Sequence, residues 1–220
     1  LSEKYNSTKA QEYGLTLPYL IFDENTGIKI SQFFDIYTYK SSDFKNENMR
    51  NNAFNVLNKL HKSDLVFENN FSPLTVFKDI ADSSNPIEEE AKEVGIKIVK
   101  TLNEIGINNS PCHQDLYSGN FISHKDTTFL IDWEYSSMGD YYFDFADLFW
   151  QNEFDLDINL RNDALHEIGI TKKDEVEKFE NFEILSMITW GLWALKKSPN
   201  DISGHKALNR AIKLSIDKKL

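Results

Sequence analysis

The sequence predicts an α+β protein in which a short helix-and-strand segment precedes a mainly helical body. Two observations support this prediction. Apolar, β-prone runs at YLIFD (19–23) and GIKIS (27–31) follow a helical stretch, as expected of a β-hairpin. Most of the remaining chain places apolar residues at helical spacing, interrupted by a second pair of short apolar runs. With 220 residues, the chain is long enough to bury a core without disulfide or metal crosslinks.

The N-terminal elements are predicted from residues that end helices or form turns and from the spacing of apolar residues. Residues 2–14 are expected to form a helix that stops at Gly14, and residues 24–27 form the turn of the hairpin. The next segment repeats apolar residues every three or four positions, which predicts a helix that buries one face. The residues of this face are Met49, Ala53, Phe54, Leu57, Leu60 and His61.

A stronger helix is predicted to begin at Asn85 and Pro86, because an asparagine cap followed by proline is typical of a helix start. Glutamates at 88–90 suit the positive end of its dipole. The polar segment 108–120 then leads into two short apolar runs, NFIS and TFLID, which predict a second hairpin. After an aromatic and acidic stretch to about Asp155, helices are expected at 171–197 and from about Asp201.

The composition narrows the possible partners. Lysine and arginine number 24 against 35 acidic residues, which gives a net charge of 24 − 35 = −11. This charge argues against nucleic acid and anionic membranes as partners and favours a cationic one, although an acidic surface also serves solubility alone. Cys112 is the single cysteine, and no run approaches the length of a membrane span. We therefore expect a cytoplasmic protein, and the sequence makes no prediction of its oligomeric state.

One constellation indicates phosphoryl transfer. His113, Asp115 and Asn120 fit the pattern H-x-D-x-x-x-x-N, and Asp132 ends the following apolar strand. A kinase needs hard oxygen ligands for Mg²⁺ and a carboxylate beside the attacking hydroxyl. Asp115 is therefore a candidate base, and Asn120 and Asp132 are candidate metal ligands. The alternative is that these polar residues only build a turn around a buried histidine.

The surrounding residues resemble the choline/ethanolamine kinase family, in particular its bacterial choline kinases. The resemblance rests on HQDLYSGNF, on IDWEYSSMGDYYFDFADLF and on MITWGLWALKK, and it extends over nearly the whole chain. It implies a protein-kinase-like bilobal fold with a partial small β lobe and a mainly helical large lobe. Residues 1–34 would be the remainder of the small lobe, and 35–220 the large lobe with the catalytic loop and the metal-binding hairpin.

The resemblance also implies an ATP- and Mg²⁺-dependent reaction and assigns roles to individual residues. Asp115, with His113, would be catalytic, and Asn120 and Asp132 would bind Mg²⁺. Asp144 resembles a structural aspartate that braces the catalytic loop. Two further resemblances concern the nucleotide. Glu3 resembles the helix glutamate that pairs with an ATP-binding lysine, and the stretch of Gln32, Phe33 and Phe34 resembles the hinge that meets adenine.

The family pattern places choline between two indoles. Trp190 and Trp193 stand three residues apart and so share one helical face. A quaternary ammonium cannot donate a hydrogen bond, so aromatic faces and negative potential must recognise it. Glu134 and Tyr135 are further candidates for substrate binding, and the additional aromatic candidates are Tyr141 and Tyr142. The alternative is that both tryptophans belong to the core.

Two departures from the family pattern affect these expectations. An acidic residue that helps to enclose choline in eukaryotic members falls near position 151, where this chain has Gln151, so that contact is absent or passes to Glu153 or Asp155. No glycine-rich phosphate loop or strand lysine precedes Glu3. We expect these parts upstream of Leu1 in a longer kinase; the alternative is a small-lobe remnant that holds ATP poorly. The chain as it stands is expected to be weakly active or inactive.

Other functions compete with choline phosphorylation. Ethanolamine is the nearest alternative substrate, and thiamine or an aminoglycoside come further behind. A choline-binding pseudokinase is the alternative from another class. A thiol nucleophile at Cys112 is disfavoured, because neighbouring residues of an extended segment point in opposite directions.

Overall fold

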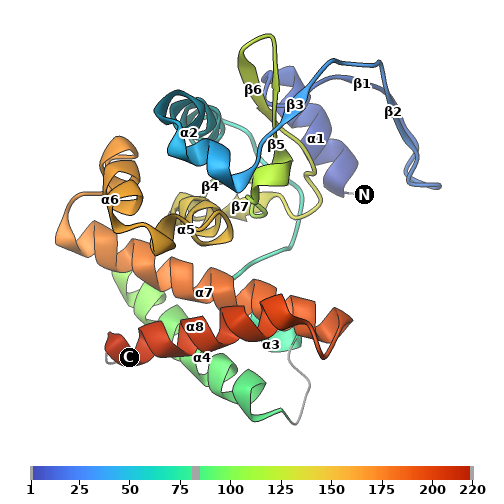
Figure 1. Cartoon of the computed structure of the whole chain (residues 1–220). Coiled ribbons are helices and arrows are strands. Elements are labelled where there is room, and N and C mark those ends of the chain that lie inside the picture. The colour runs from blue at the N-terminus through green and yellow to red at the C-terminus, as the bar shows by residue number, and fades with distance from the viewer. Residues whose placement is uncertain (1, 81–84, 219–220) are drawn as a thin grey trace.

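The computed structural model describes residues 2–80 and 85–218, and it has a projecting hairpin above a helical body (Figure 1). Its helices are α1 (Ser2–Glu12), α2 (Glu47–His61), α3 (Val76–Ile80), α4 (Pro86–Ile105), α5 (Tyr141–Gln151), α6 (Ile158–Glu167), α7 (Lys173–Lys197) and α8 (Ile202–Asp217). Its strands are β1 (Tyr19–Phe22), β2 (Lys29–Ser31), β3 (Tyr37–Thr38), β4 (Ser110–Cys112), β5 (Phe121–His124), β6 (Thr127–Leu130) and β7 (Ser137–Gly139). Short 3₁₀ turns lie at Ser41–Lys45, Ser118–Asn120 and Phe154–Leu156.

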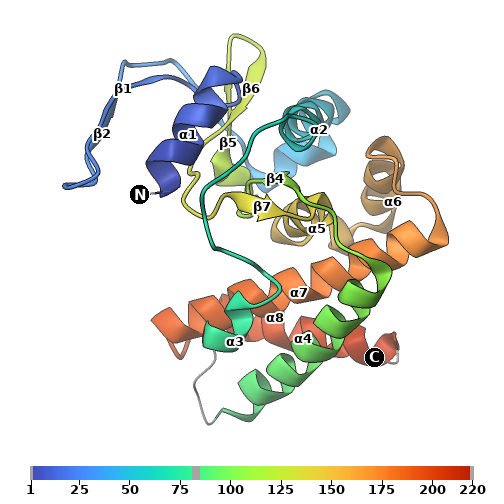
Figure 2. The same cartoon turned by 180° about the vertical axis from the view of Figure 1, so that it is seen from behind.

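Three small antiparallel sheets organise the strands. The hairpin of β1 and β2 extends away from the rest of the molecule in both views (Figures 1 and 2). Strand β5 lies between β3 and β6, while β4 pairs with β7. The predicted second hairpin is thereby confirmed as β5 and β6, in which Phe121 faces Leu130 and His124 faces Thr127. These two small sheets frame the loop that carries the kinase-like motif.

Helix α1 is attached to the large body as well as to the hairpin. The Asn6 side chain donates to the backbone oxygen of Ser136 at 2.8 Å and accepts from the Glu68 backbone N–H at 2.8 Å. The backbone N–H of Leu130 donates to the Leu15 carbonyl at 2.8 Å. Residues 2–15 are therefore held against the motif hairpin, and β1 and β2 alone project.

Helix α7 is the centre of the helical body, with α4, α5 and α8 packed against it (Figure 2). Contact on several sides explains why most of its residues are buried. Two glycines set the spacing between α7 and α8. A Cβ on Gly191 would lie 2.7 Å from the Leu208 side chain, and a Cβ on Gly204 would lie 3.0 Å from the Gly191 carbonyl oxygen. Larger residues at these positions would push α8 away from α7.

The α+β prediction is confirmed, with small differences in where the helices begin and end. The Asn85 side chain accepts from the Ile87 backbone N–H at 3.2 Å, as its predicted capping role requires. The aromatic and acidic stretch contains helix α5, whose cap Asp140 accepts from the Tyr142 N–H at 3.0 Å. Within the described ranges, each helix is too short or too polar to cross a bilayer.

Candidate active site

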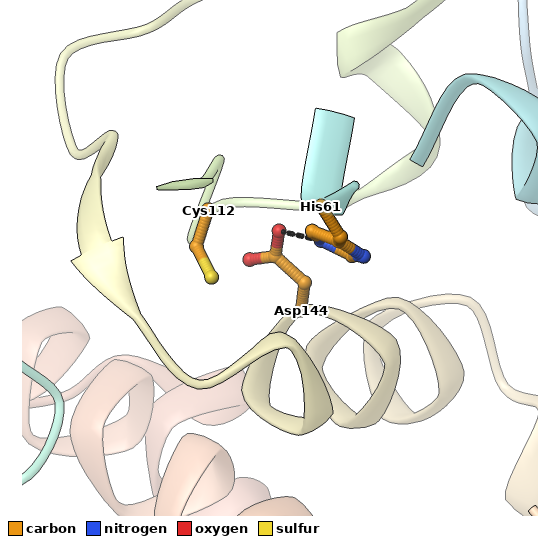
Figure 3. Close-up of side chains that lie close together, drawn as sticks. All are labelled: His61, Cys112 and Asp144. Atoms are coloured by element: carbon orange, nitrogen blue, oxygen red, sulfur yellow. Dashed lines mark hydrogen bonds and ion pairs between the residues drawn. The ribbon is translucent and has the colours of Figure 1, made fainter. Parts of the chain in front are cut away.

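The motif loop leaves β4 and is fixed from behind by one buried carboxylate. Asp144, at the start of α5, is fully buried and accepts the backbone N–H groups of His113 at 2.9 Å and Gln114 at 2.8 Å. The His61 Nε2 atom lies 2.7 Å from the same carboxylate (Figure 3). Gln114 has a φ of 70°, a left-handed conformation that needs such support in a residue other than glycine. Asp144 thus lies behind the loop.

Cys112 stands on the other side of Asp144, and its sulfur, the carboxylate and His61 lie within 4.8 Å of one another (Figure 3). Both carboxylate oxygens already accept backbone N–H groups. Burial raises the pKa of the Cys112 thiol well above its ordinary value, so the thiolate that binds metals is disfavoured. We interpret the cluster as a structural brace.

His113 fastens the motif loop to the neighbouring hairpin. Its ring is fully buried, its Nε2 donates to the Ile131 carbonyl at 2.9 Å, and it packs 4.8 Å from the Trp133 ring. This contact fixes the residue that precedes Asp132. The structure therefore gives His113 a positioning contact away from the cavity described below, where the sequence predicted a catalytic residue.

Asp115, Asn120 and Asp132 meet at the open side of this frame. The Asn120 amide nitrogen donates to the backbone oxygen of Asp115 at 2.9 Å and to its carboxylate at 3.1 Å. The backbone carbonyl of Asn120 accepts from the Ile131 N–H at 3.0 Å, which places Asn120 beside Asp132. Burial raises the pKa of the Asp115 carboxyl above its ordinary value, and the charge of Asp132 acts in the same direction. The loop therefore presents a half-buried carboxyl group beside an exposed one.

The Asn120 amide has a defined orientation. Because its nitrogen donates to Asp115, its side-chain oxygen is the atom left for a cation. Asp132 is an exposed residue, and its backbone has a φ of 66°. An amide oxygen and a free carboxylate are hard donors that suit Mg²⁺, so these residues fit the ion.

A cavity of about 660 Å³ connects Asp115 to the C-terminal helices. Four of the predicted substrate-binding residues line it, namely Glu134, Tyr135, Trp190 and Trp193. The two indole rings lie 5.8 Å apart at 79°, and Tyr135 meets Trp190 edge-on at 5.0 Å. The candidate base and the candidate aromatic cage thus share one cavity.

The cavity is electrically negative near Asp115. Burial raises the pKa of Glu134, and the charges of Asp132, Glu3 and Asp115 raise it further. Burial, followed by the charge of Glu134, also raises the pKa of Tyr135. These mutual effects mean that several acidic groups share one small region, as a divalent cation or a cationic substrate requires.

Several sequence expectations about this cavity change with the structure. Tyr141 and Tyr142 lie elsewhere: Tyr141 packs on His61, and Tyr142 receives the Lys178 ammonium 4.9 Å from its ring centre. The sequence made both residues candidates for the aromatic cage, but they follow the turn into α5, and neither lines the cavity. Gln151 and Glu153 do line the cavity, whereas the Asp155 side chain lies outside the described residues.

The residues expected to meet the nucleotide lie around the projecting hairpin. The Glu3 carboxylate pairs with the Lys29 ammonium on β2 at 3.7 Å, and its charge reaches Glu134. The sequence carries no motif that identifies Lys29 as this partner. Residues 32–36 join β2 to β3. Within this stretch Gln32 is exposed and Phe33 is 89% exposed, while Phe34 packs edge-on against His124 at 5.5 Å.

One wall of the cavity was not predicted from the sequence. Helix α8 supplies Ser203, Lys206, Ala207 and Arg210 to its lining. These residues carry no recognisable motif, since they reach the cavity only because α8 packs closely on α7. Phe71, which stacks on Trp190 at 6.1 Å and 20° from outside the cavity lining, was not predicted either.

Comparisons with known proteins agree with this geometry. Residues 98–179, which span the motif loop, both motif strands and α5, match the model of the phosphotransferase enzyme family. This part of the chain is similar to the domains of that family. The protein LicA of Haemophilus influenzae strain KW20 is 28% identical over 153 residues, which cover 66% of this chain and 57% of that protein. Another Haemophilus influenzae LicA matches at 28% with 45% of its length covered. The chain spans about half the length of these curated relatives.

Solved structures extend the likeness beyond residues 98–179. The crystal structure of choline kinase LicA from Streptococcus pneumoniae matches with a TM-score of 0.84 and 27% identity, covering 96% of this chain and 78% of that one. LicA in complex with AMP matches with a TM-score of 0.81 and 26% identity, over 96% of this chain and 77% of that one. Aminoglycoside 2'-phosphotransferase-IIIa, at 11% identity and a TM-score of 0.67 over 97% and 82% of the two chains, shares the fold. The protein-kinase-like fold prediction is confirmed.

Proposed function

We propose that the protein phosphorylates the hydroxyl group of choline, with ATP as donor and Mg²⁺ as cofactor, to give phosphocholine. The observation that carries this proposal is the shared cavity, which has Asp115 at one end and an aromatic wall of Trp190, Trp193 and Tyr135. The 27% identity to a choline kinase LicA supports the same substrate. Each cation–π contact with a quaternary ammonium contributes roughly 0.5 to 2 kcal/mol.

The proposed reaction gives individual residues specific roles. Asp115 orients the choline hydroxyl and accepts its proton as the oxygen attacks the γ-phosphorus. The bond from that phosphorus to the oxygen bridging the β-phosphate then breaks, and ADP leaves. The Asn120 side-chain oxygen and the Asp132 carboxylate would hold Mg²⁺, which neutralises phosphate charge when it is bound. The raised pKa of Asp115 brings this carboxyl closer to the range of an effective base.

The small lobe is expected to contribute to ATP binding through Glu3 and the segment Gln32, Phe33 and Phe34. The Glu3–Lys29 pair supports this placement, because it links α1 to β2 and holds the Glu3 carboxylate close enough to Glu134 to raise the pKa of Glu134. Residues 32–36 form no strand or helix, and Gln32 and Phe33 are exposed, which supports a role of this segment in meeting a purine.

Selectivity within the class depends on the nature of the cation. A bare ammonium, as in ethanolamine, requires hydrogen-bond acceptors, whereas a trimethylammonium requires aromatic walls. The rings of Trp190, Trp193 and Tyr135 favour the trimethylated substrate.

An ADP-release assay with Mg²⁺ and ATP tests the proposal on the protein expressed from its full reading frame. Choline, ethanolamine, thiamine and an aminoglycoside are compared at equal concentration. We expect turnover to be fastest with choline. A rate led by another alcohol would overturn the substrate assignment, and absent turnover with a choline-induced rise in Tm would replace the enzyme with a choline-binding protein.

A further inference from the structure

We propose that Asp147 is a positioning residue, which holds Asp115 at the cavity wall through the backbone of Leu116 and the side-chain amide of Gln151. The inference rests on the proposed phosphotransferase activity and adds a second buried carboxylate to the one at Asp144. Asp147 is fully buried on α5, one helical turn after Asp144, and has no surface on the cavity.

The contacts of Asp147 reach both sides of the candidate base. Its Oδ2 accepts the Leu116 backbone N–H at 2.7 Å, directly after Asp115 in the chain. The Gln151 amide nitrogen donates to both Asp147 oxygens at 3.1 Å. A hydrogen bond from the same Gln151 side chain lowers the pKa of Asp115. One neutral amide thus links a buried carboxylate to the carboxylate that faces the cavity.

Helix α7 completes the network. The Ser186 hydroxyl donates to Asp147 Oδ1 at 2.6 Å and accepts from the Trp150 indole N–H at 2.7 Å. Asn152, which caps the C-terminal end of α5, also supports the loop, since its amide nitrogen donates to the Leu116 carbonyl at 2.9 Å. The loop, α5 and α7 therefore meet at Asp147.

Each of these hydrogen-bond partners is a donor to Asp147, so the network requires the ionised carboxylate. Protonation would put a donor where the loop and Gln151 need an acceptor. Burial raises the pKa of Asp147 to about 7, with the charge of Asp115 as the next cause. Its own helix α5 presents the neutral Gln151 to this carboxylate, and α7 presents the neutral Ser186. A change of pH near neutrality would then alter how the loop is held.

The test compares D147N with E183Q, a matched control. Glu183 is also a buried carboxylate with a pKa raised by burial, but it pairs with Arg161 at 2.7 Å, away from the loop. We expect D147N to lower kcat at least tenfold with a choline KM within about threefold, because a small misplacement of a catalytic group is costly. E183Q should keep the wild-type kcat at a temperature where both variants are folded.

The pH profile separates positioning from general stability. In the wild-type protein kcat should fall as the pH drops through about 7, where Asp147 gains a proton. In D147N this acid limb should move to lower pH, because the remaining limb belongs to Asp115, from whose surroundings the charge of Asp147 has been removed. An acid limb at the same pH in both proteins, or a D147N kcat within twofold of wild type, would overturn the proposal.

Amide hydrogen exchange of the motif loop tests the positioning role of Asp147 independently of enzymatic activity. If the wild-type protein phosphorylates no alcohol, the proposed activity fails, but exchange in residues 113–120 still reports on the loop. We expect faster exchange there in D147N and unchanged exchange in E183Q; equal exchange in D147N and wild type would contradict the positioning role. Should D147N not fold, S186A removes one Asp147 contact and is expected to change the loop and the acid limb in the same direction, to a smaller extent.

Discussion

The Lys197 ammonium lies 3.7 Å from the centre of the Trp193 ring, one helical turn further along α7. The same ammonium lowers the pKa of Glu134, so its charge also reaches the acidic part of the cavity. A cationic substrate held by Trp193 would be repelled by this neighbour. The positive charge of Lys197 is therefore expected to weaken the binding of a cation at the aromatic wall.

Replacing Lys197 by methionine is expected to lower the choline KM. The substitution keeps an unbranched apolar stem over the indole and removes the positive charge. We expect a two- to fivefold change, since cation interactions at partly exposed aromatic sites are worth about 0.5–1 kcal/mol. K196M is the matched control, because it removes the same charge from the next residue of α7. A KM for K197M equal to that of K196M would show that Lys197 does not oppose the substrate.

Asp115 is expected to be needed for turnover and dispensable for choline binding. D115N retains the shape of the side chain and removes its capacity to accept a proton. We expect kcat to fall at least 100-fold, as is typical for loss of a general base. Choline binding, followed by quenching of tryptophan fluorescence, should remain within about threefold of wild type. A variant that keeps more than about a tenth of the wild-type kcat would remove Asp115 from proton transfer.

Trp193 should contribute to choline affinity and not to ATP affinity. In W193A we expect the choline KM to rise by roughly 2- to 30-fold, which corresponds to one cation–π contact of about 0.5–2 kcal/mol. The ATP KM serves as the control within the same variant, and it should stay within about twofold. Equal weakening for both substrates would assign Trp193 to the core.

The close contact between α7 and α8 predicts the effect of G191A. The new Cβ would lie 2.7 Å from the Leu208 side chain and 3.2 Å from the Gly204 carbonyl oxygen. We expect a loss of about 1–3 kcal/mol in the free energy of unfolding, measured by urea denaturation. K213A, at an exposed position of α8, should stay within about 0.5 kcal/mol of wild type. Similar values for the two variants would mean that α8 moves freely against α7.

Stability should depend on pH through Asp147. Its folded pKa of about 7 lies above the ordinary value of 3.8, so the native state binds more protons than the unfolded chain between these limits. The contribution of Asp147 to stability is complete below pH 4 and is lost as the pH rises through 7. Urea denaturation across this range should give a shallower decline for D147N than for wild type. Parallel curves would show that the Asp147 carboxyl is not perturbed.

The sequence alone predicts those parts of the site that local spacing determines. The positions of Asp115, Asn120 and Asp132 follow from a loop and a hairpin whose turns are encoded within about twenty residues. The shared face of Trp190 and Trp193 follows from helical periodicity. The fold class was likewise predictable, because the helices and both hairpins carry clear caps, turns and apolar patterns.

Long-range packing explains what the sequence could not predict. Lys206 and Arg210 line the cavity only because Gly191 and Gly204 allow α8 to lie close to α7. Asp147 reads in the sequence as one more acidic residue of FDFAD, and its partners Leu116 and Ser186 are 31 and 39 residues away. The direction taken by Tyr141 and Tyr142 depends on the turn from β7 into α5. None of these relationships leaves a periodic or motif signal.

In the proposed function, the catalytic residues and most of the substrate-binding wall come from different stretches of the chain. The candidate phosphoryl-transfer residues lie within 113–132, whereas the wall formed by α7 and α8 comes from residues 190–210. A mutant library confined to the second stretch should therefore retune the accepted alcohol while the ATP-handling parts stay intact. Slow ATP hydrolysis without any alcohol would then serve as a constant baseline across that library. Such a division makes the two C-terminal helices a natural place to engineer new acceptors.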